Sequence, residues 1–168
     1  MSNPRFSRKR VIAASDCDEL GHVNNVRWLA FVGELAGAHA SGRGSGLAAL
    51  RAQGALWIVR RHEIDYHRPA LPGEEIVEET WVERMTGAKS ERRSRFTRAA
   101  DGAPLCEALT VWAYVDATTL RPKRIPPELM TYFGWKGLYA GISEGICAPM
   151  NEVETYNQGF RDVARDKK

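Results

Sequence analysis

The residues DCDELGHVNN, positions 16–25, stand directly before the apolar run VRWLAFVGELAGAHA, positions 26–40. Asp, Gly and Asn residues in the first segment are typical of a loop that ends in a helix-capping residue. The second segment has apolar side chains on nearly every side of a helix, with Arg27, Glu34 and His39 as its interruptions. A helix that is apolar all round is buried, so the sequence predicts a long buried helix over 26–40.

Strand-like patterns lie on both sides of this helix. Residues 8–14 form a short candidate strand before it, and four longer candidates follow it at 56–67, 75–85, 89–99 and 105–116. Turn residues separate these four, which favours an antiparallel meander. The strand at 105–116 is apolar on both faces, so both faces are expected to be packed against other elements. One of these packing elements is expected to come from another subunit. One helix on a sheet of about five strands is an α+β fold, and a single sheet wrapped around a central helix is called a hotdog.

Length and composition fit one such domain. The chain has 168 residues, of which 43% are hydrophobic and 27% charged. That is enough to bury a core without disulfide bonds or a structural metal. We expect the hotdog domain to cover 1–133, and 134–168 to be a C-terminal extension of unknown role with a candidate amphipathic helix near 152–164.

Charge and cysteine content argue against several classes of protein. The net charge is +3, and the ends are basic, with four basic and no acidic side chains in residues 1–10. We interpret these ends as solvated tails, because a nucleic-acid-binding protein carries its positive charge on the folded body. The three cysteines have neither metal-ligand nor disulfide-framework spacing. With no secretory signal and no apolar run long enough to cross a bilayer, the expectation is a cytoplasmic protein without membrane insertion, metal or cofactor.

The segment 16–25 also holds the densest group of functional side chains. Free N–H groups and the positive dipole end at a helix start polarise a carbonyl oxygen and stabilise an oxyanion. A carboxylate a few residues upstream then attacks the carbonyl carbon or activates a water molecule. These features suffice in principle for hydrolysis of an acyl ester or thioester, although capping and turn formation alone require the same residue types.

The run from Asp16 to Trp28 resembles the signature of hotdog-fold acyl-CoA thioesterases of the 4-hydroxybenzoyl-CoA thioesterase type. The resemblance extends to the pattern Y-x-R-P-A-x-x-G-E at 66–74 and to T-x-R-P-x-R-I-P at 119–126, and it covers 8–133. It implies a thioesterase that converts acyl-CoA, or acyl-ACP, to a free acid and a thiol. It also implies a homodimer or homotetramer that needs no cofactor.

The resemblance further implies roles for single residues. The catalytic carboxylate would be Asp18, and the N–H group that polarises the thioester carbonyl would be that of Asn25. The loop is also similar to the catalytic loop of plant acyl-ACP thioesterases, whose Asp and His fall on Asp18 and His22 and whose later Glu falls on Glu34. Their Asn is Leu20 here. This departure favours a carboxylate-centred mechanism and leaves the role of His22 open.

Further positions are candidate substrate contacts, and Asp16 is expected to be structural. The binding candidates are Asn24, Glu34, Ile64, Tyr66, Lys89 and Ser90. Residues 64–67 of the partner subunit are expected to close the acyl pocket beside Asn25. The basic stretch 89–98 would suit the phosphates of CoA, but we favour a solvated strand face or a charge-protected edge strand.

Two other functions stay open. A hotdog hydratase or dehydratase would also act on an acyl thioester, but it commonly uses a D-x-N-P-x-H pattern, whose Pro and spacing this chain lacks. A non-catalytic protein that binds acyl thioesters is the other alternative, and the carboxylate of Asp18 before the helix argues against it.

Overall fold

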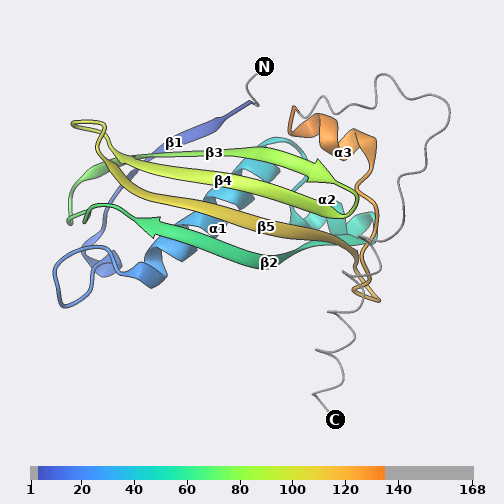
Figure 1. The fold of residues 1–168 in the computed structure, drawn as a ribbon, viewed down its shortest axis with the longest axis horizontal. Coiled ribbons are helices and arrows are strands. Elements are labelled where there is room, and N and C mark those ends of the chain that lie inside the picture. The colour runs from blue at the N-terminus through green and yellow to red at the C-terminus, as the bar shows by residue number, and fades with distance from the viewer. Residues whose placement is uncertain (1–3, 135–168) are drawn as a thin grey trace, which may run out of the picture.

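A five-stranded antiparallel sheet curves around one long helix in the computed structural model, which describes residues 4–134 (Figure 1). The long helix is α1, and two short helices, α2 and α3, lie at one end of the sheet. The elements are β1 (Phe6–Val11), the 3-10 turn η1 (Ala14–Asp16), α1 (Asn25–Gly42), α2 (Leu47–Ala52), β2 (Ala55–Tyr66), β3 (Glu75–Thr86), β4 (Lys89–Arg98), β5 (Pro104–Asp116) and α3 (Pro127–Tyr132). The predicted hotdog fold is confirmed. The candidate helix near 152–164 lies outside the described residues.

Helix α1 begins where the capping pattern predicted. The side-chain oxygen of Asn24 accepts a hydrogen bond from the N–H group of Val26 at 2.8 Å, which satisfies one of the orphan donors of the first turn. One face of the helix is buried against the sheet, through Trp28, Phe31, Val32, Leu35, Ala36 and His39. The prediction of a helix buried all round was wrong for the single chain, because Val26 is 72% exposed and Leu29 is 39% exposed.

The predicted meander holds only for β3, β4 and β5. The strand order is β1-β3-β4-β5-β2, so β2 pairs with β5 and not with β3. The connection at 67–74 is too long for a hairpin turn and carries Pro69 and Pro72, so it crosses the end of the sheet instead. Within it, Ala70 is fully buried and its carbonyl accepts the N–H of Val23 at 3.0 Å. The second motif of the sequence thus holds the first in place.

Strand β1 covers Phe6–Val11, two residues earlier than the predicted start, and the basic residues in it are not a solvated tail. Arg5 and Lys9 form ion pairs with Glu79 and Glu75 at 3.5 and 2.8 Å. The register places Arg8 directly opposite Glu78, and Lys9, which is opposite Val77, reaches Glu75 diagonally. Cross-strand pairs of opposite charge favour this register, which explains why β1 joins the sheet at that edge.

His39 is a buried polar side chain in the C-terminal half of α1. Its ring stacks on Phe6 with 5.3 Å between centroids, and its Nδ1 lies 2.9 Å from Nη1 of Arg92. Burial, and then the charges of Arg92 and Arg43, lower the pKa of His39 to about 4. In the unfolded chain its pKa is about 6.5. The unfolded state therefore takes up the proton first, and protein stability falls as the pH falls from about 6.5 towards 4.

The variant His39→Gln, which keeps an acceptor atom but cannot titrate, is expected to lose less stability over that pH range than the wild type. Urea unfolding of both proteins at several pH values between about 7.5 and 4.5 measures this difference. His67→Gln, at an exposed site, is the control for removal of an imidazole. Parallel losses in the wild type and in His39→Gln would show that other groups cause the decline.

Candidate active site

The loop at 17–24 folds back on itself as a tight turn beside the start of α1. The N–H group of Asp18 donates to the carbonyl of His22 at 3.1 Å, and that of Gly21 donates to the carbonyl of Asp18 at 3.0 Å. Gly21 has a φ of 77°, in the left-handed region where a residue without Cβ is not strained. The turn therefore holds Asp18 across from His22, close to the helix cap Asn24.

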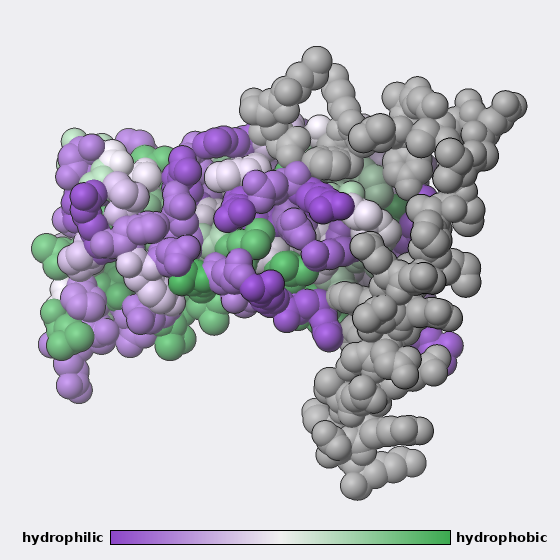
Figure 2. Space-filling model, in the orientation of Figure 1, coloured by the Kyte–Doolittle hydropathy of each residue, from purple (hydrophilic) through white to green (hydrophobic). Residues whose placement is uncertain are grey.

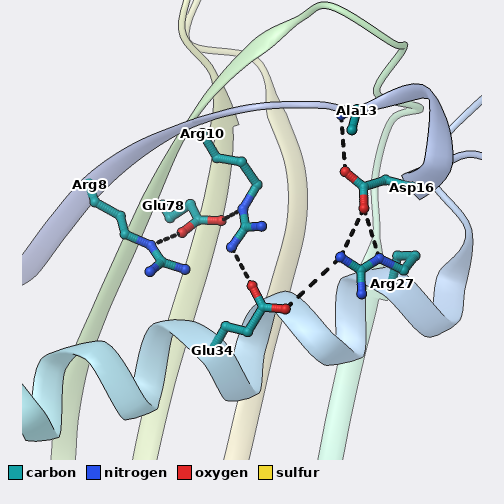
Figure 3. Close-up of polar contacts among 7 residues, drawn as sticks. All are labelled: Arg8, Arg10, Ala13, Asp16, Arg27, Glu34 and Glu78. Atoms are coloured by element: carbon teal, nitrogen blue, oxygen red, sulfur yellow. Dashed lines mark hydrogen bonds and ion pairs between the residues drawn. The ribbon is translucent and has the colours of Figure 1, made fainter.

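Asp16 anchors this loop to the helix. It is 7% exposed, and its carboxylate accepts the N–H of Ala13 at 3.0 Å and two donors of Arg27, Nε and Nη2, at 2.8 Å each (Figure 3). Its carbonyl accepts the N–H of Asn24 at 3.0 Å. Both side-chain oxygens thus have protein partners, which suits a structural role and leaves little for a substrate.

Asp18 has a different environment. It is half-buried, and its Oδ1 accepts the N–H of Leu20 at 2.9 Å. Within residues 4–134, no hydrogen-bond donor reaches its Oδ2. One oxygen therefore orients the side chain through a local turn, and the other is available to water or to a substrate.

The start of α1 offers a donor close to this loop. The side chain of Asn24 caps Val26, and its carbonyl accepts the N–H groups of Arg27 and Trp28 at 2.8 and 3.2 Å. The N–H of Asn25, an exposed residue, has no acceptor among the described residues. It lies at the positive end of the helix dipole, where a carbonyl oxygen that reached it would be polarised.

Tyr66, at the end of β2, reaches this helix start from the same chain. Its hydroxyl donates to the carbonyl oxygen of Asn25 at 3.4 Å, and its side chain is partly exposed. Burial, followed by the neighbouring Cys106, raises the pKa of Tyr66. The pairing of β2 with β5 brings this chain's own Tyr66 to the helix start, and the closing of the acyl pocket by residues 64–67 of a partner subunit stays a prediction. Ile64 packs against the core below it.

Neither described cysteine is a good nucleophile. Burial and the carboxylates of Asp16 and Asp18 raise the pKa of Cys17. Burial, with Asp65 and Glu107, raises that of Cys106 to about 12. A thiol is nucleophilic as its thiolate, so the raised pKa values make both thiols poor nucleophiles near neutral pH. Among the described residues, no group of three His, Cys, Asp or Glu side chains is arranged to hold a metal ion, and no helix is long and apolar enough to cross a membrane.

Glu34 lies nine residues into α1, about 14 Å along the axis from the helix start. Its carboxylate is 2.7 Å from Nη2 of Arg10 and 4.0 Å from Nη2 of Arg27. It belongs to a row of alternating charges that we call the charge ladder: Arg8, Glu78, Arg10, Glu34, Arg27 and Asp16 (Figure 3). The structure thus connects Glu34 to the loop through Arg27 and Asp16 and does not place it beside Asp18.

Sequence reasoning missed the inner part of this ladder. Glu78 is fully buried, and both Arg8 and Arg10 bind its carboxylate. The strand pattern could have indicated that Glu78 is buried, because Glu78 stands at an inward position of β3 between the buried Ile76 and Thr80. A buried acid requires cationic or hydrogen-bonding partners, and alternate arginines on a neighbouring strand can supply them.

Lys89 and Ser90 lie far from the loop within one chain. They begin β4, whereas Phe96, near the other end of that strand, pairs with Cys106 beside Tyr66. Seven residues of strand separate these ends by about 23 Å. Lys89 forms an ion pair with Glu91 at 2.6 Å, and Ser90 is only 4% exposed.

The interpretation of 89–98 as an edge strand was wrong. β4 lies inside the sheet, between β3 and β5. Outward arginines pair with acids on its neighbours, Arg93 with Glu83 at 2.7 Å and Arg95 with Glu107 at 2.8 Å. The basic stretch is therefore largely neutralised by acids on β3 and β5, which are the neighbours that the predicted meander gives it.

The variant Asp16→Asn is expected to reduce stability more than catalysis. The amide keeps one acceptor but loses the charge that binds Arg27, and a hydrogen bond to a charged group contributes about 1.5–3 kcal/mol. Urea unfolding should show a loss of about that size, with most of the turnover retained. Glu19→Gln, an exposed acid of the same loop, is the control. A stable but inactive Asp16→Asn protein would identify Asp16, and not Asp18, as the reactive acid.

Comparison with known proteins identifies the family of the chain. The model of the thioesterase-like superfamily matches residues 12–133, and no curated protein matches the chain. One similar solved structure is a 1,4-dihydroxy-2-naphthoyl-CoA thioesterase from Synechocystis, with 17% identity, a TM-score of 0.72, and 78% of this chain and 96% of that chain covered. The range matched by the family model includes the loop at 16–25 and the connection at 67–74.

Two further structures are similar. One is an acyl-ACP thioesterase from Bacteroides thetaiotaomicron, with 22% identity, a TM-score of 0.71 and 86% of this chain covered; this chain spans only 58% of that longer protein. The other is the Staphylococcus aureus protein SAV2348 in complex with CoA, with 12% identity, a TM-score of 0.74, and coverage of 89% and 98%. At these identities the structures establish the shared fold, and the family model covers most of the chain. The chain therefore belongs to the thioesterase-like superfamily and is a thioester hydrolase.

Proposed function

We propose that this chain hydrolyses acyl-CoA thioesters, with Asp18 and the N–H of Asn25 as its catalytic groups. The observation that carries the proposal is that Oδ2 of Asp18, in the loop before α1, and the N–H of Asn25, at the start of α1, both lack partners within residues 4–134. The similar fold solved with CoA supports the CoA ester as substrate. The acyl-ACP thioesterase of similar fold makes acyl-ACP the second candidate.

In the proposed reaction, the thioester carbonyl oxygen accepts the N–H of Asn25, and negative charge develops on that oxygen beside the helix dipole. The carboxylate of Asp18 either attacks the carbonyl carbon, which expels the thiolate and leaves a mixed anhydride for water to hydrolyse, or takes a proton from a water molecule that attacks directly. Both routes consume one water and release a carboxylic acid and a thiol. His22 is given a secondary role, because Leu20 stands where the plant-type loop has Asn.

The proposed acyl group enters beside Asn25, with Asn24, Ile64 and Tyr66 around it. Lys89 and Ser90 remain candidate contacts to the CoA nucleotide, and their distance from the loop means that a partner subunit would have to bring them there. Glu34 remains a candidate for the substrate site that acts through Arg27, because the charge ladder connects Glu34 to the loop.

A thiol-release assay tests the proposal. The full-length protein is supplied with acyl-CoAs of increasing chain length, with aryl-CoAs and with acyl-ACP, and Asp18→Asn is the control for contaminating activity. We expect turnover of at least one CoA ester, which the variant loses. Turnover of acyl-ACP alone would change the substrate class. Hydration of an enoyl-CoA without thiol release would favour the hydratase alternative. Tight binding of acyl thioesters without turnover would favour the non-catalytic binding protein.

We further propose that the working unit is at least a homodimer, in the cytoplasm as the cysteine content predicts. Exposed apolar side chains, among them Val26, Leu29 and Tyr66, surround the helix start. Hydrophobic surface is visible at that end of the molecule, at the left of Figure 2. Strand β2, twelve residues long, forms an edge of the sheet, and a long uncovered edge favours pairing with another chain.

The dimer is expected at micromolar concentration, and Leu29→Lys is expected to weaken it and to lower turnover with it. A charge on that face would have to be buried at the interface without a partner. Sedimentation velocity measures the oligomeric state. Leu120→Lys is the matched control, because Leu120 is 45% exposed against 39% for Leu29 and lies in the connector after β5. A fully active monomer of about 19 kDa would contradict the proposal.

A further inference from the structure

A cavity of about 160 Å³ lies against the C-terminal half of α1, between that helix, α2 and the sheet. Its wall is mostly apolar and includes Leu50, Trp57, Met85 and Phe133. An apolar cavity of about 150 Å³ in another protein is large enough to bind benzene. This cavity therefore has room for one ring or for a short alkyl chain.

A buried cation lies in that wall. Arg92, on the inward face of β4, is 5% exposed. Its Nη1 lies 2.9 Å from Nδ1 of His39 and 3.2 Å from the hydroxyl of Thr80. Neither partner is an anion, and no carboxylate of residues 4–134 pairs with it. Burial lowers the pKa of Arg92 to about 10, so the guanidinium stays charged at neutral pH. A buried charge without a counter-charge is costly.

A second donor in the same wall has no acceptor. The indole Nε1 of Trp112 is buried and has no hydrogen-bond partner in the described part of the chain. The side chain of Ser90, 4% exposed, lies in the same wall. An indole and a guanidinium can only donate. A ligand that satisfied both donors would therefore be an acceptor, and beside Arg92 a negatively charged one.

We propose that this cavity binds the carboxylate of a small apolar acid, of the size of benzoate or hexanoate. The carboxylate accepts from Arg92 and from Nε1 of Trp112, and the apolar body lies against the wall of Leu50 and Met85. The two oxygens of a carboxylate match the planar arrangement of N–H donors on a guanidinium. Gly37 and Leu47, which also line the cavity, are exposed, so the ligand has access from the surface.

This cavity is separate from the loop of Asp18 and the helix start, and it shares only Ser90 with the candidate substrate contacts. Its residues on α1, Ala36 to Ala40, lie 11 to 15 positions beyond Asn25, or about 16 to 22 Å along the helix. The inference does not depend on which thioester the chain hydrolyses, and it is tested by binding and not by turnover. Its failure and the failure of the proposed function are therefore distinguishable.

Calorimetric titration of the full-length protein tests it, with benzoate and hexanoate as ligands and benzamide and hexanamide as their uncharged counterparts. We expect the acids to bind and the amides to bind at least tenfold more weakly. Arg92→Met keeps most of the side-chain volume without the charge and should also weaken acid binding at least tenfold. Arg93→Met is the matched control, because the adjacent Arg93 faces outward and pairs with Glu83; it should bind as the wild type does.

Gly37→Leu and Trp112→Phe carry the test independently should Arg92→Met fail to fold. A Cβ at Gly37 meets no atom within 4 Å, so leucine there is expected to fill the cavity and abolish binding, while Trp112→Phe removes only the N–H donor and should weaken it. Circular dichroism checks that each variant is folded. The proposal would be overturned if the full-length wild type bound no acid, or if it bound the amides or sulfate as tightly as the acids. It would also be overturned if a folded Arg92→Met or Gly37→Leu variant bound the acids as tightly as the wild type does.

Discussion

Asp18→Asn is expected to lower the turnover of a good acyl-CoA substrate by about two orders of magnitude or more. The amide oxygen can still accept the N–H of Leu20, which holds the side chain at 2.9 Å in the wild type. The turn from Asp18 to His22 is therefore preserved. What is lost is the negative charge, and an amide can neither attack a thioester nor take a proton from water. The measurement is kcat from thiol release, with circular dichroism and thermal unfolding as checks of the fold.

Two other substitutions in the loop make this result specific. Glu19→Gln removes an exposed acid next to Asp18 and should leave kcat close to the wild-type value. His22→Ala should lower kcat less than Asp18→Asn does, since within residues 4–134 the His22 ring makes no hydrogen bond and its backbone carbonyl holds the turn. Near-normal turnover by a well-folded Asp18→Asn protein would disprove the mechanism. Equal losses in the Asp18 and His22 variants would instead favour the plant-type assembly.

Glu78→Gln is expected to have the largest effect on stability, a loss of about 3 kcal/mol in the free energy of unfolding. The carboxylate of Glu78 is fully buried and binds both Arg8 and Arg10. Removal of its charge leaves two cations close together without their shared anion. The arginines are 31% and 20% exposed, so water relieves part of the repulsion, and the loss stays below the largest values for buried pairs.

Urea unfolding measures this loss, and Glu83→Gln is the matched control. Glu83 also lies on β3 and pairs with an arginine of the neighbouring strand, but its side chain is 44% exposed. An exposed pair contributes about 1 kcal/mol or less, so the control should remain close to the wild type. A loss below about 1 kcal/mol for Glu78→Gln would show that the charge ladder contributes little to the stability of the fold.

Local residue patterns were sufficient for most of the elements. Periodicity identified the four long strands to within about a residue, and the polar loop ending in helix-capping residue types marked the start of α1. The loop at 16–25 was recognisable because Asp, Gly and Asn side chains satisfy backbone groups only a few residues away, as Asp18 does with Leu20. A local signal of this kind does not depend on what packs against it.

The neighbours of each element depended on the tertiary structure. Short turns suggested that β2 pairs with β3, but the burial of Ala70 and its bond to Val23 direct the chain across the sheet, so that β2 pairs with β5. The same pairing brings Tyr66 to Asn25 of its own chain. Pairing partners are chosen by contacts between residues far apart in sequence, which local patterns do not contain.

For this protein, the sequence by itself determined the hotdog fold, the capped helix and the acidic loop before it, because hydrophobic period, capping and turn chemistry act over a few residues. Only the tertiary structure showed which hydrogen-bond partners the two carboxylates have. Asp16 and Asp18 are equivalent in composition and two positions apart, but Arg27 and Ala13 occupy both oxygens of Asp16 while Oδ2 of Asp18 has no partner in the described chain. It also decided that Arg92 is buried beside a cavity without an anion, since burial is a property of the packed elements and not of the residue.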